Sequence, residues 1–133
     1  MTKPKILVVD DDPDLVRAMR LRVRANNYEV STATDGYSAI ASAQKERPSL
    51  IILDLGLPVG DGFVVLERLQ NSDVLAGIPV IVLSARDPQN NEERALKAGA
   101  AAFFQKPADN DELMNVIRVS LGPGTARPAP WPS

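Results

Sequence analysis

The sequence predicts an α/β domain in which helices cover a five-stranded parallel sheet. Short apolar runs rich in β-branched residues recur five times along the chain, and stretches with the apolar spacing of a helix separate them. The runs start roughly 22 to 30 residues apart, which is the spacing of consecutive strand–helix units with right-handed crossovers. Three of the five runs are apolar throughout, as expected for strands that are covered on both faces.

The expected strands are short, and they differ in pattern. The second alternates between apolar and polar residues, so we expect it at an edge of the sheet. In chain order the strands are Lys5–Val9, Tyr28–Thr32, Leu50–Leu53, Val80–Leu83 and Ala102–Phe104.

Five helices are expected between and after these strands. The first has the strongest start, because Asp12 is a favoured N-cap residue and Pro13 suits the first helical position. Its apolar residues fall on one face, and its arginines are expected to be solvated. The other four helices are expected near Tyr37–Glu46, Gly62–Gln70, Pro88–Ala98 and Asp109–Leu121.

The length of 133 residues predicts one domain, which we place at residues 3–121. Residues 122–133 contain four prolines and cannot continue a helix or a strand. This segment is interpreted as a Pro-rich tail or a truncated linker.

Composition excludes several kinds of chemistry. The chain has no Cys and no His, so disulfides, zinc sites built from Cys and His, and Ser-His-Asp triads are excluded. The net charge of −2 and the absence of a basic block argue against direct nucleic-acid binding. No apolar run approaches the ~20 residues of a membrane span, so we expect a cytoplasmic protein with no membrane partner.

Polar side chains follow four of the expected strands. Asp10 and Asp11 come after the first strand, Asp54 after the third, Ser84 after the fourth and Lys106 after the fifth. The carboxyl ends of parallel strands meet at one edge of the sheet, where sites of such folds lie. We therefore expect these side chains to converge on one site.

The three carboxylates would repel one another unless a cation neutralised them. Oxygen ligands suit a hard cation such as Mg²⁺, which binds one or two carboxylates and leaves room for a phosphate. A carboxylate can also be the nucleophile of phosphoryl transfer, and Asp54 is the best candidate for that role. In this hypothesis Asp11 and Asp54 hold Mg²⁺, Lys106 pairs with a phosphoryl oxygen and Ser84 donates a hydrogen bond to another.

Four sequence segments together resemble the receiver domain of bacterial two-component response regulators. The resemblance covers about residues 3–121, and its specificity comes from the order and spacing of all four motifs. The motifs are KILVVDDDP at Lys5–Pro13, LDLGLPVGDG at Leu53–Gly62, VLSA at Val82–Ala85 and FQKP at Phe104–Pro107.

The resemblance implies a flavodoxin-like fold with strand order 2-1-3-4-5. It implies that a partner histidine kinase or phosphotransfer protein phosphorylates Asp54, and that the chain catalyses only its own phosphorylation and dephosphorylation. It also implies that Asp11, Asp54 and the backbone carbonyl of Gly56 hold Mg²⁺, with Asp10 in support. The Lys106–Pro107 peptide bond is expected to be cis.

The resemblance further implies a switch that controls a downstream protein or a fused output domain. In the phosphorylated state Ser84 moves onto the phosphoryl group and Phe103 turns inward, which changes the face made by the fourth helix, fifth strand and fifth helix. A phosphoryl group adds about −1.5 to −2 charges and strong acceptor oxygens, which gives Ser84 a new partner. Since the chain has no His, it cannot be the phosphohistidine donor.

Simpler interpretations of single residues stay open. Asp12 suits a cap, Asp54 a turn, Ser84 a loop hydroxyl and Phe103 the core. The Asp61–Gly62 pair is interpreted as a turn.

Three other functions are weighed for the whole chain. An aspartyl-phosphate phosphohydrolase of the haloacid-dehalogenase type would need an Asp where Gly56 stands, and a flavin-binding domain would need a phosphate-cradling loop where the acidic residues follow the first strand. A binding module that is never phosphorylated is the remaining alternative.

Overall fold

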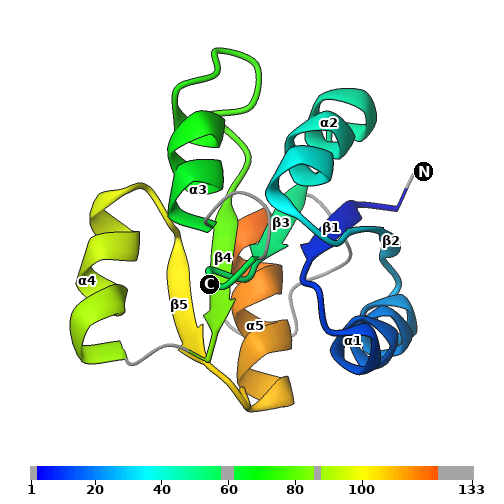
Figure 1. Cartoon of the computed structure of the whole chain (residues 1–133). Helices are drawn as coiled ribbons and strands as arrows, with labels where there is room; N and C mark the ends of the chain where they lie inside the picture. The colour runs from blue at the N-terminus through cyan, green and yellow to red at the C-terminus, as the bar shows by residue number, and fades with distance from the viewer. Residues whose placement is uncertain (1–2, 58–61, 86–87, 123–133) are drawn as a thin grey trace.

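A computed structural model describes residues 3–57, 62–85 and 88–122. Within these ranges five parallel strands form one sheet in the order β2-β1-β3-β4-β5, which confirms the predicted fold class and strand order (Figure 1). The strands are β1 (Lys5–Val9), β2 (Glu29–Ala33), β3 (Leu50–Leu53), β4 (Val80–Ser84) and β5 (Ala102–Gln105).

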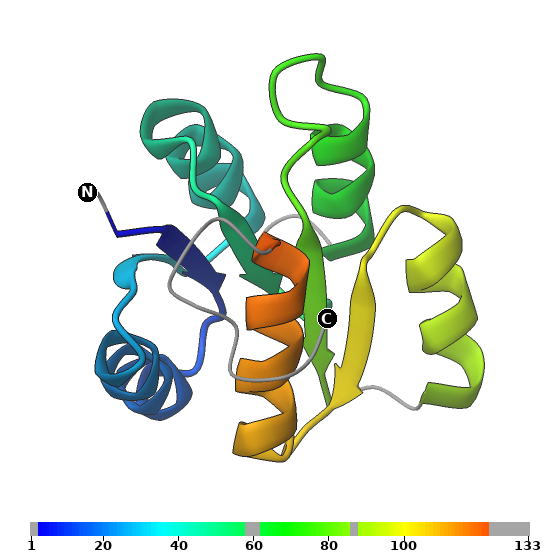
Figure 2. The same cartoon turned by 180° about the vertical axis from the view of Figure 1, so that it is seen from behind.

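Helices cover both faces of this sheet. The first and fifth helices lie on one face, and the second, third and fourth lie on the other (Figures 1 and 2). Their bounds are α1 (Pro13–Ala25), α2 (Gly36–Glu46), α3 (Gly62–Gln70), α4 (Pro88–Lys97) and α5 (Asn110–Leu121).

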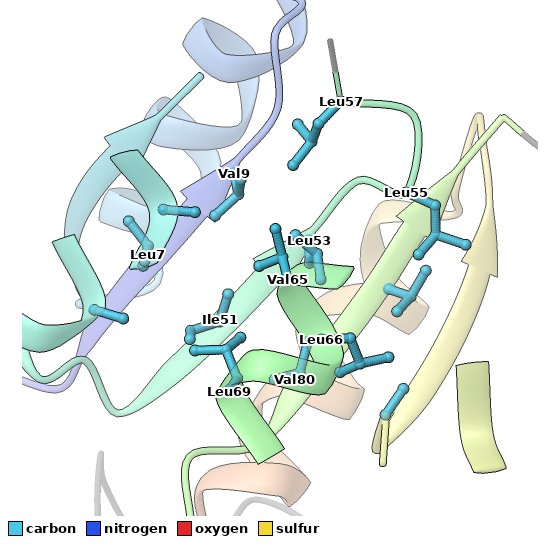
Figure 3. Close-up of a cluster of buried hydrophobic side chains, with 14 of the residues drawn as sticks. Leu7, Val9, Ile51, Leu53, Leu55, Leu57, Val65, Leu66, Leu69 and Val80 are labelled. Atoms are coloured by element: carbon cyan, nitrogen blue, oxygen red, sulfur yellow. The ribbon is translucent and has the colours of Figure 1, made fainter. Parts of the chain in front are cut away.

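The core consists of two buried clusters, one on each face of the sheet. In β1, Leu7 and Val9 belong to the cluster under α2 and α3, while Ile6 and Val8 belong to the cluster under α1 and α5. Figure 3 shows the first cluster, in which side chains of β1 and β3 meet those of α3. Because successive side chains of a strand point to opposite faces, a strand covered on both faces must be apolar at every position.

The two edge strands are less buried than the central strands. The described residues of β2 are mostly exposed or half-buried, and β2 lies at one edge of the sheet, as its alternating sequence predicted. The fifth strand lies at the other edge and is also only partly buried. The central strands β1, β3 and β4 are buried at almost every position, whereas the apolar run Ala102–Phe104 belongs to an edge strand.

The second strand begins one residue later than predicted, at Glu29 rather than Tyr28. Asn27, with a φ of 73°, turns the chain after α1, and the N–H of Tyr28 donates to the carbonyl of Val23. The Tyr28 side chain is buried in the cluster under α1 and α5. Strand pairing begins only at Glu29, which is in register with Lys5. Tyr28, although its residue type favours strands, therefore belongs to the connection between α1 and β2.

Among the residues that the structure describes, aspartates cap three of the helices. Asp12 accepts hydrogen bonds from the N–H groups of Asp14 and Leu15, which confirms its predicted role as the cap of α1. Asp35 and Asp109 cap α2 and α5 in the same way. Such caps satisfy N–H groups that have no partner inside the helix.

Two predictions fall on residues outside the described ranges. These are the Pro-rich tail beyond Gly122 and the Asp61 half of the Asp61–Gly62 turn. Among the helices that the structure describes, none has the length and apolar character needed to cross a membrane.

Candidate functional site

The sheet itself positions the polar residues predicted to form a site. The N–H of Asp54 donates to the carbonyl of Val9 at 2.9 Å, which fixes the end of β3 beside the end of β1. The N–H of Lys106 donates to the carbonyl of Ser84 at 2.8 Å, which fixes the residue after β5 beside the end of β4. The predicted convergence at the carboxyl ends of the strands is therefore present in the backbone.

Lys106 bridges two buried carboxylates. Its Nζ lies 2.7 Å from Oδ2 of Asp10 and 3.7 Å from Oδ2 of Asp54. Asp10 is only 2 % exposed and Asp54 only 6 % exposed. Buried charges need partners, and within the described residues Lys106 is the cation that both carboxylates share.

The second oxygen of each carboxylate is held by its own loop. Oδ1 of Asp10 accepts a hydrogen bond from the N–H of Asp12 at 3.0 Å, and Oδ1 of Asp54 accepts one from the N–H of Gly56 at 3.2 Å. These are turns in which an aspartate bonds to the backbone two residues on. Each carboxylate thus has one oxygen fixed by a loop and one oxygen directed toward Lys106.

Asp11 completes an acidic cluster with Asp10 and Asp54. One carboxylate oxygen from each of the three residues lies within 4.8 Å of the others. Asp11 is exposed, whereas the other two are buried. Three carboxylates that converge without nitrogen or sulfur ligands are a donor set suited to a hard divalent cation, so these residues fit Mg²⁺.

The electrostatics of Asp54 reflect a crowded site. Burial raises the pKa of the Asp54 carboxyl, and the charges of Asp10 and Asp11 raise it further. The N–H of Gly56 and the ammonium of Lys106 act in the opposite direction, but the net direction is upward. Ionisation of Asp54 is therefore less favourable in the folded protein than in the unfolded chain.

Lys106 is held in its charged form by its neighbours. Burial lowers the pKa of the Lys106 ammonium, but the hydrogen bond and charge of Asp10 together with the charge of Asp54 outweigh it, and the net direction is upward. Lys106 therefore supplies a fixed positive charge between the two carboxylates.

Ser84 and Phe103 lie on the same face of the sheet. Ser84 is fully buried and pairs in register with Gln105, and Phe103 is two residues before Gln105 on the same strand. Since side chains alternate along a strand, Ser84 and Phe103 both point toward the face covered by α3 and α4. Phe103 is half-buried and packs against the core cluster on that face.

Two further expectations can be compared with the structure. The Lys106–Pro107 peptide bond is cis, as expected. The close pairing of Lys106 with Asp10 was not foreseen, because the sequence hypothesis paired Lys106 with a phosphoryl oxygen and gave Asp10 only a supporting part. No local sequence signal could have found a contact between residues 96 positions apart.

We expect Mg²⁺ to stabilise the fold through this cluster. A ligand that binds only the folded state stabilises it by about 2.7 kcal/mol when present at 100 times its Kd. Thermal unfolding in EDTA and in excess MgCl₂ measures this effect. Asp11→Asn should lose most of the Mg²⁺-dependent rise in Tm, because it removes an exposed ligand that carries none of the site's internal hydrogen bonds among the described residues.

Asp14→Asn is the matched control for Asp11→Asn. Asp14 is also exposed and lies three residues further along the chain, but it is not part of the acidic cluster. Its substitution by Asn removes the same charge. We expect it to keep the full response to Mg²⁺. An undiminished response in Asp11→Asn would contradict a metal site at this cluster.

Comparison with known proteins identifies relatives for almost the whole folded region. The family model for the response regulator receiver domain matches residues 6–118. The transcriptional regulatory protein PrrA of Mycobacterium tuberculosis is 39% identical over 121 residues, covering 91% of this chain and 51% of PrrA. The chain therefore spans about half the length of this relative.

Solved structures of receiver domains are similar to this chain over nearly its whole length. The receiver domain of the sensor histidine kinase PA1611 from Pseudomonas aeruginosa, which holds a magnesium ion in its active-site cleft, has a TM-score of 0.83 and 29% identity, with 91% of this chain and 99% of that chain covered. A CheY-like receiver domain protein from Methanospirillum hungatei has a TM-score of 0.84 and 27% identity, with 90% and 94% covered.

Proposed function

Because the chain belongs to the response regulator receiver domain family, we propose that it is a signalling switch activated by phosphorylation of Asp54. The observation that carries this proposal is the arrangement around that residue. Asp54 is a buried carboxylate with one oxygen held by the N–H of Gly56, and a metal-competent acidic cluster and the Lys106 ammonium lie beside it. This set provides a nucleophile together with cations for the charge of a phosphoryl group.

The phosphoryl group would come from a phosphohistidine on a partner histidine kinase or phosphotransfer protein, since this chain has no His. A carboxylate oxygen of Asp54 forms a bond to phosphorus, and the bond from phosphorus to the partner's imidazole nitrogen breaks, with the electron pair leaving on that nitrogen. The product is an acyl phosphate on Asp54. The chain would thus catalyse only its own phosphorylation and dephosphorylation, without turning over a separate substrate.

Each neighbour has a separate proposed task in this step. Asp11, Asp54 and the Gly56 carbonyl would hold Mg²⁺, which when bound neutralises charge on the phosphoryl oxygens. Asp10 supports the site, because it orients Lys106 at 2.7 Å. Lys106 would then pair with a phosphoryl oxygen from the position it already holds near Asp54.

The proposed output is a change of the surface formed by α4, β5 and α5. Ser84 would donate its hydroxyl hydrogen bond to the phosphoryl group, and Phe103, on the same face of the sheet, would turn inward. The altered surface would control a downstream protein or a fused output domain. PrrA is a transcriptional regulator that is about twice the length of the matched region, which supports a partner or attached domain as the recipient of the signal.

The experiment that tests this function is incubation of the chain with acetyl phosphate, with and without MgCl₂, followed by intact-protein mass. We expect a gain of one phosphoryl group that depends on Mg²⁺. Hydroxylamine should remove it, because it cleaves acyl phosphates. Proteolytic mapping should place the modification on the peptide that contains Asp54.

Two results would contradict the proposal. One is a modification that withstands hydroxylamine or maps to a different peptide. The other is an unmodified protein under every condition, which would favour a receiver-like module that acts by binding alone.

A further inference from the structure

A cleft of about 340 Å³ lies beside the acidic cluster, between α1 and the segment that follows β2. Asp10 and Asp11, which precede the first turn of α1, and Thr34, which follows β2, belong to its lining. Val16, Arg17 and Arg20 line it from successive turns of α1. The lining of the cleft therefore joins two carboxylates of the acidic cluster to two arginines further along α1, at the edge of the sheet where α1 packs beside β2 (Figure 1).

Arg17 and Arg20 are available to bind an anion. They are three residues apart on α1, so they share one face of the helix. Both are exposed, and neither forms an ion pair with a described residue; the guanidinium of Arg20 reaches only the hydroxyl of Thr32, at 3.5 Å. Guanidinium groups bind carboxylates and phosphates through paired hydrogen bonds.

We propose that this cleft is a subsite for the leaving group of a small-molecule phosphodonor, and that it selects acyl phosphates whose acyl part carries a second anionic group. The inference rests on the proposed function, because the phosphoryl end of the donor must lie at Asp54. A carboxylate oxygen of Asp54 forms the new bond to phosphorus. The bond between phosphorus and the acyl oxygen breaks, and the released carboxylate keeps the electron pair, so no proton is transferred.

The charges along the cleft favour such a donor. Near the acidic cluster, the carboxylate of Asp10 is paired with Lys106, and that of Asp11 would hold Mg²⁺ under the proposed function, so the repulsion of an anion by both carboxylates is reduced. Further along, Arg17 and Arg20 would attract the distal anionic group, while Val16 offers apolar contact to the carbon skeleton between the two ends. Binding energy from a part of the substrate that does not react can be used to position the part that does.

The test compares benzoyl phosphate with 4-carboxybenzoyl phosphate, which share a rigid ring and differ by one carboxylate. The rate of phosphorylation is followed by intact mass at low ionic strength with MgCl₂. We expect the native chain to react about ten times faster with the carboxylated donor at equal subsaturating concentration, as one good charged contact would produce. The ratio of the two rates is the readout, because general damage to the site affects both donors.

The double substitution Arg17→Gln with Arg20→Gln should bring this ratio close to one. Arg24→Gln is the matched control and should keep the native ratio, since Arg24 is exposed on the same helix but does not line the cleft. A native ratio near one, or a ratio that the double substitution leaves unchanged, would overturn the subsite while phosphorylation by benzoyl phosphate upholds the receiver function. Failure of both donors to phosphorylate the native chain would overturn both proposals.

Discussion

Replacing Asp54 by Asn is expected to abolish Mg²⁺-dependent phosphorylation and, in the absence of metal, to make the fold more stable at neutral pH. The first effect follows because an amide lacks the nucleophilic oxygen that would form the acyl phosphate. Intact mass after incubation with acetyl phosphate should therefore show no added phosphoryl group, where the native chain gains one.

The second effect follows from the cost of ionising Asp54 inside the protein. Burial, reinforced by the charges of Asp10 and Asp11, raises the pKa of Asp54 above its value in the unfolded chain. Asn has nearly the same shape and can still accept the hydrogen bond from the N–H of Gly56, but it carries no charge. A gain of about 1 kcal/mol would raise Tm by roughly 4 °C for a domain of this size.

The pH dependence of this gain has a definite sign. The folded state binds the proton of Asp54 more tightly than the unfolded state does, so ionisation of Asp54 lowers the stability of the native chain as pH rises above the unfolded value of 3.8. Below that pH the carboxyl is protonated in both states and the advantage of Asn should disappear. Above the raised folded pKa the advantage should be constant. Unfolding of the two proteins in EDTA over a pH series measures this difference.

Asp73→Asn is the control for the loss of one negative charge. Asp73 is exposed in the connection between α3 and β4, which leads to the amino end of β4 and away from the site. We expect it to leave both the stability and the phosphorylation unchanged. If Asp54→Asn were destabilising at pH 7, or equally stabilising at all pH values, the electrostatic account of the site would be wrong.

The parts of this fold that follow from short-range patterns could be predicted from the sequence. Apolar runs identified all five strands and the alternating run identified one edge strand, whereas the apolar run Ala102–Phe104 gave no sign that β5 is the other edge. The site could be anticipated as well, because residues that directly follow parallel strands must meet at one edge of the sheet. Asp10, Asp54 and Lys106 satisfy this rule. A carboxylate oxygen of each aspartate lies within 4 Å of the Lys106 Nζ.

Features that depend on how distant segments meet could not be predicted in the same way. The sequence indicates that Lys106 lies near the carboxylates, but the choice of Asp10 as its close partner depends on the positions of two loops 96 residues apart. The start of α3 is a second example. A helix was predicted to begin near Gly62, and it does, but the sequence does not show that this residue lies against the segment that carries Asp54.

Gly62→Ala is expected to be strongly destabilising because of that close approach. A Cβ at this position would lie 2.4 Å from Cα of Leu55 and 2.6 Å from the carbonyl oxygen of Asp54. Both neighbours are backbone atoms, so no side chain can rotate away, and α3 would have to move away from the end of β3. Overpacking of this kind costs about 3 kcal/mol, which exceeds the roughly 1 kcal/mol that Ala gains over Gly inside a helix.

The same displacement should also slow phosphorylation, because it acts on the backbone of Asp54, the proposed nucleophile. The N–H of Gly62 donates to the carbonyl of Leu55 at 3.0 Å, so moving α3 pulls on the residue next to Asp54. Urea unfolding followed by circular dichroism, and the rate of phosphorylation by acetyl phosphate, measure the two effects.

Gly77→Ala is the matched control, since a Cβ there meets nothing within 4 Å and the stability should stay within about 0.5 kcal/mol of native. Equal stability of the two variants would show that α3 can shift without cost. The close packing of α3 against the end of β3 would then not determine the position of Asp54.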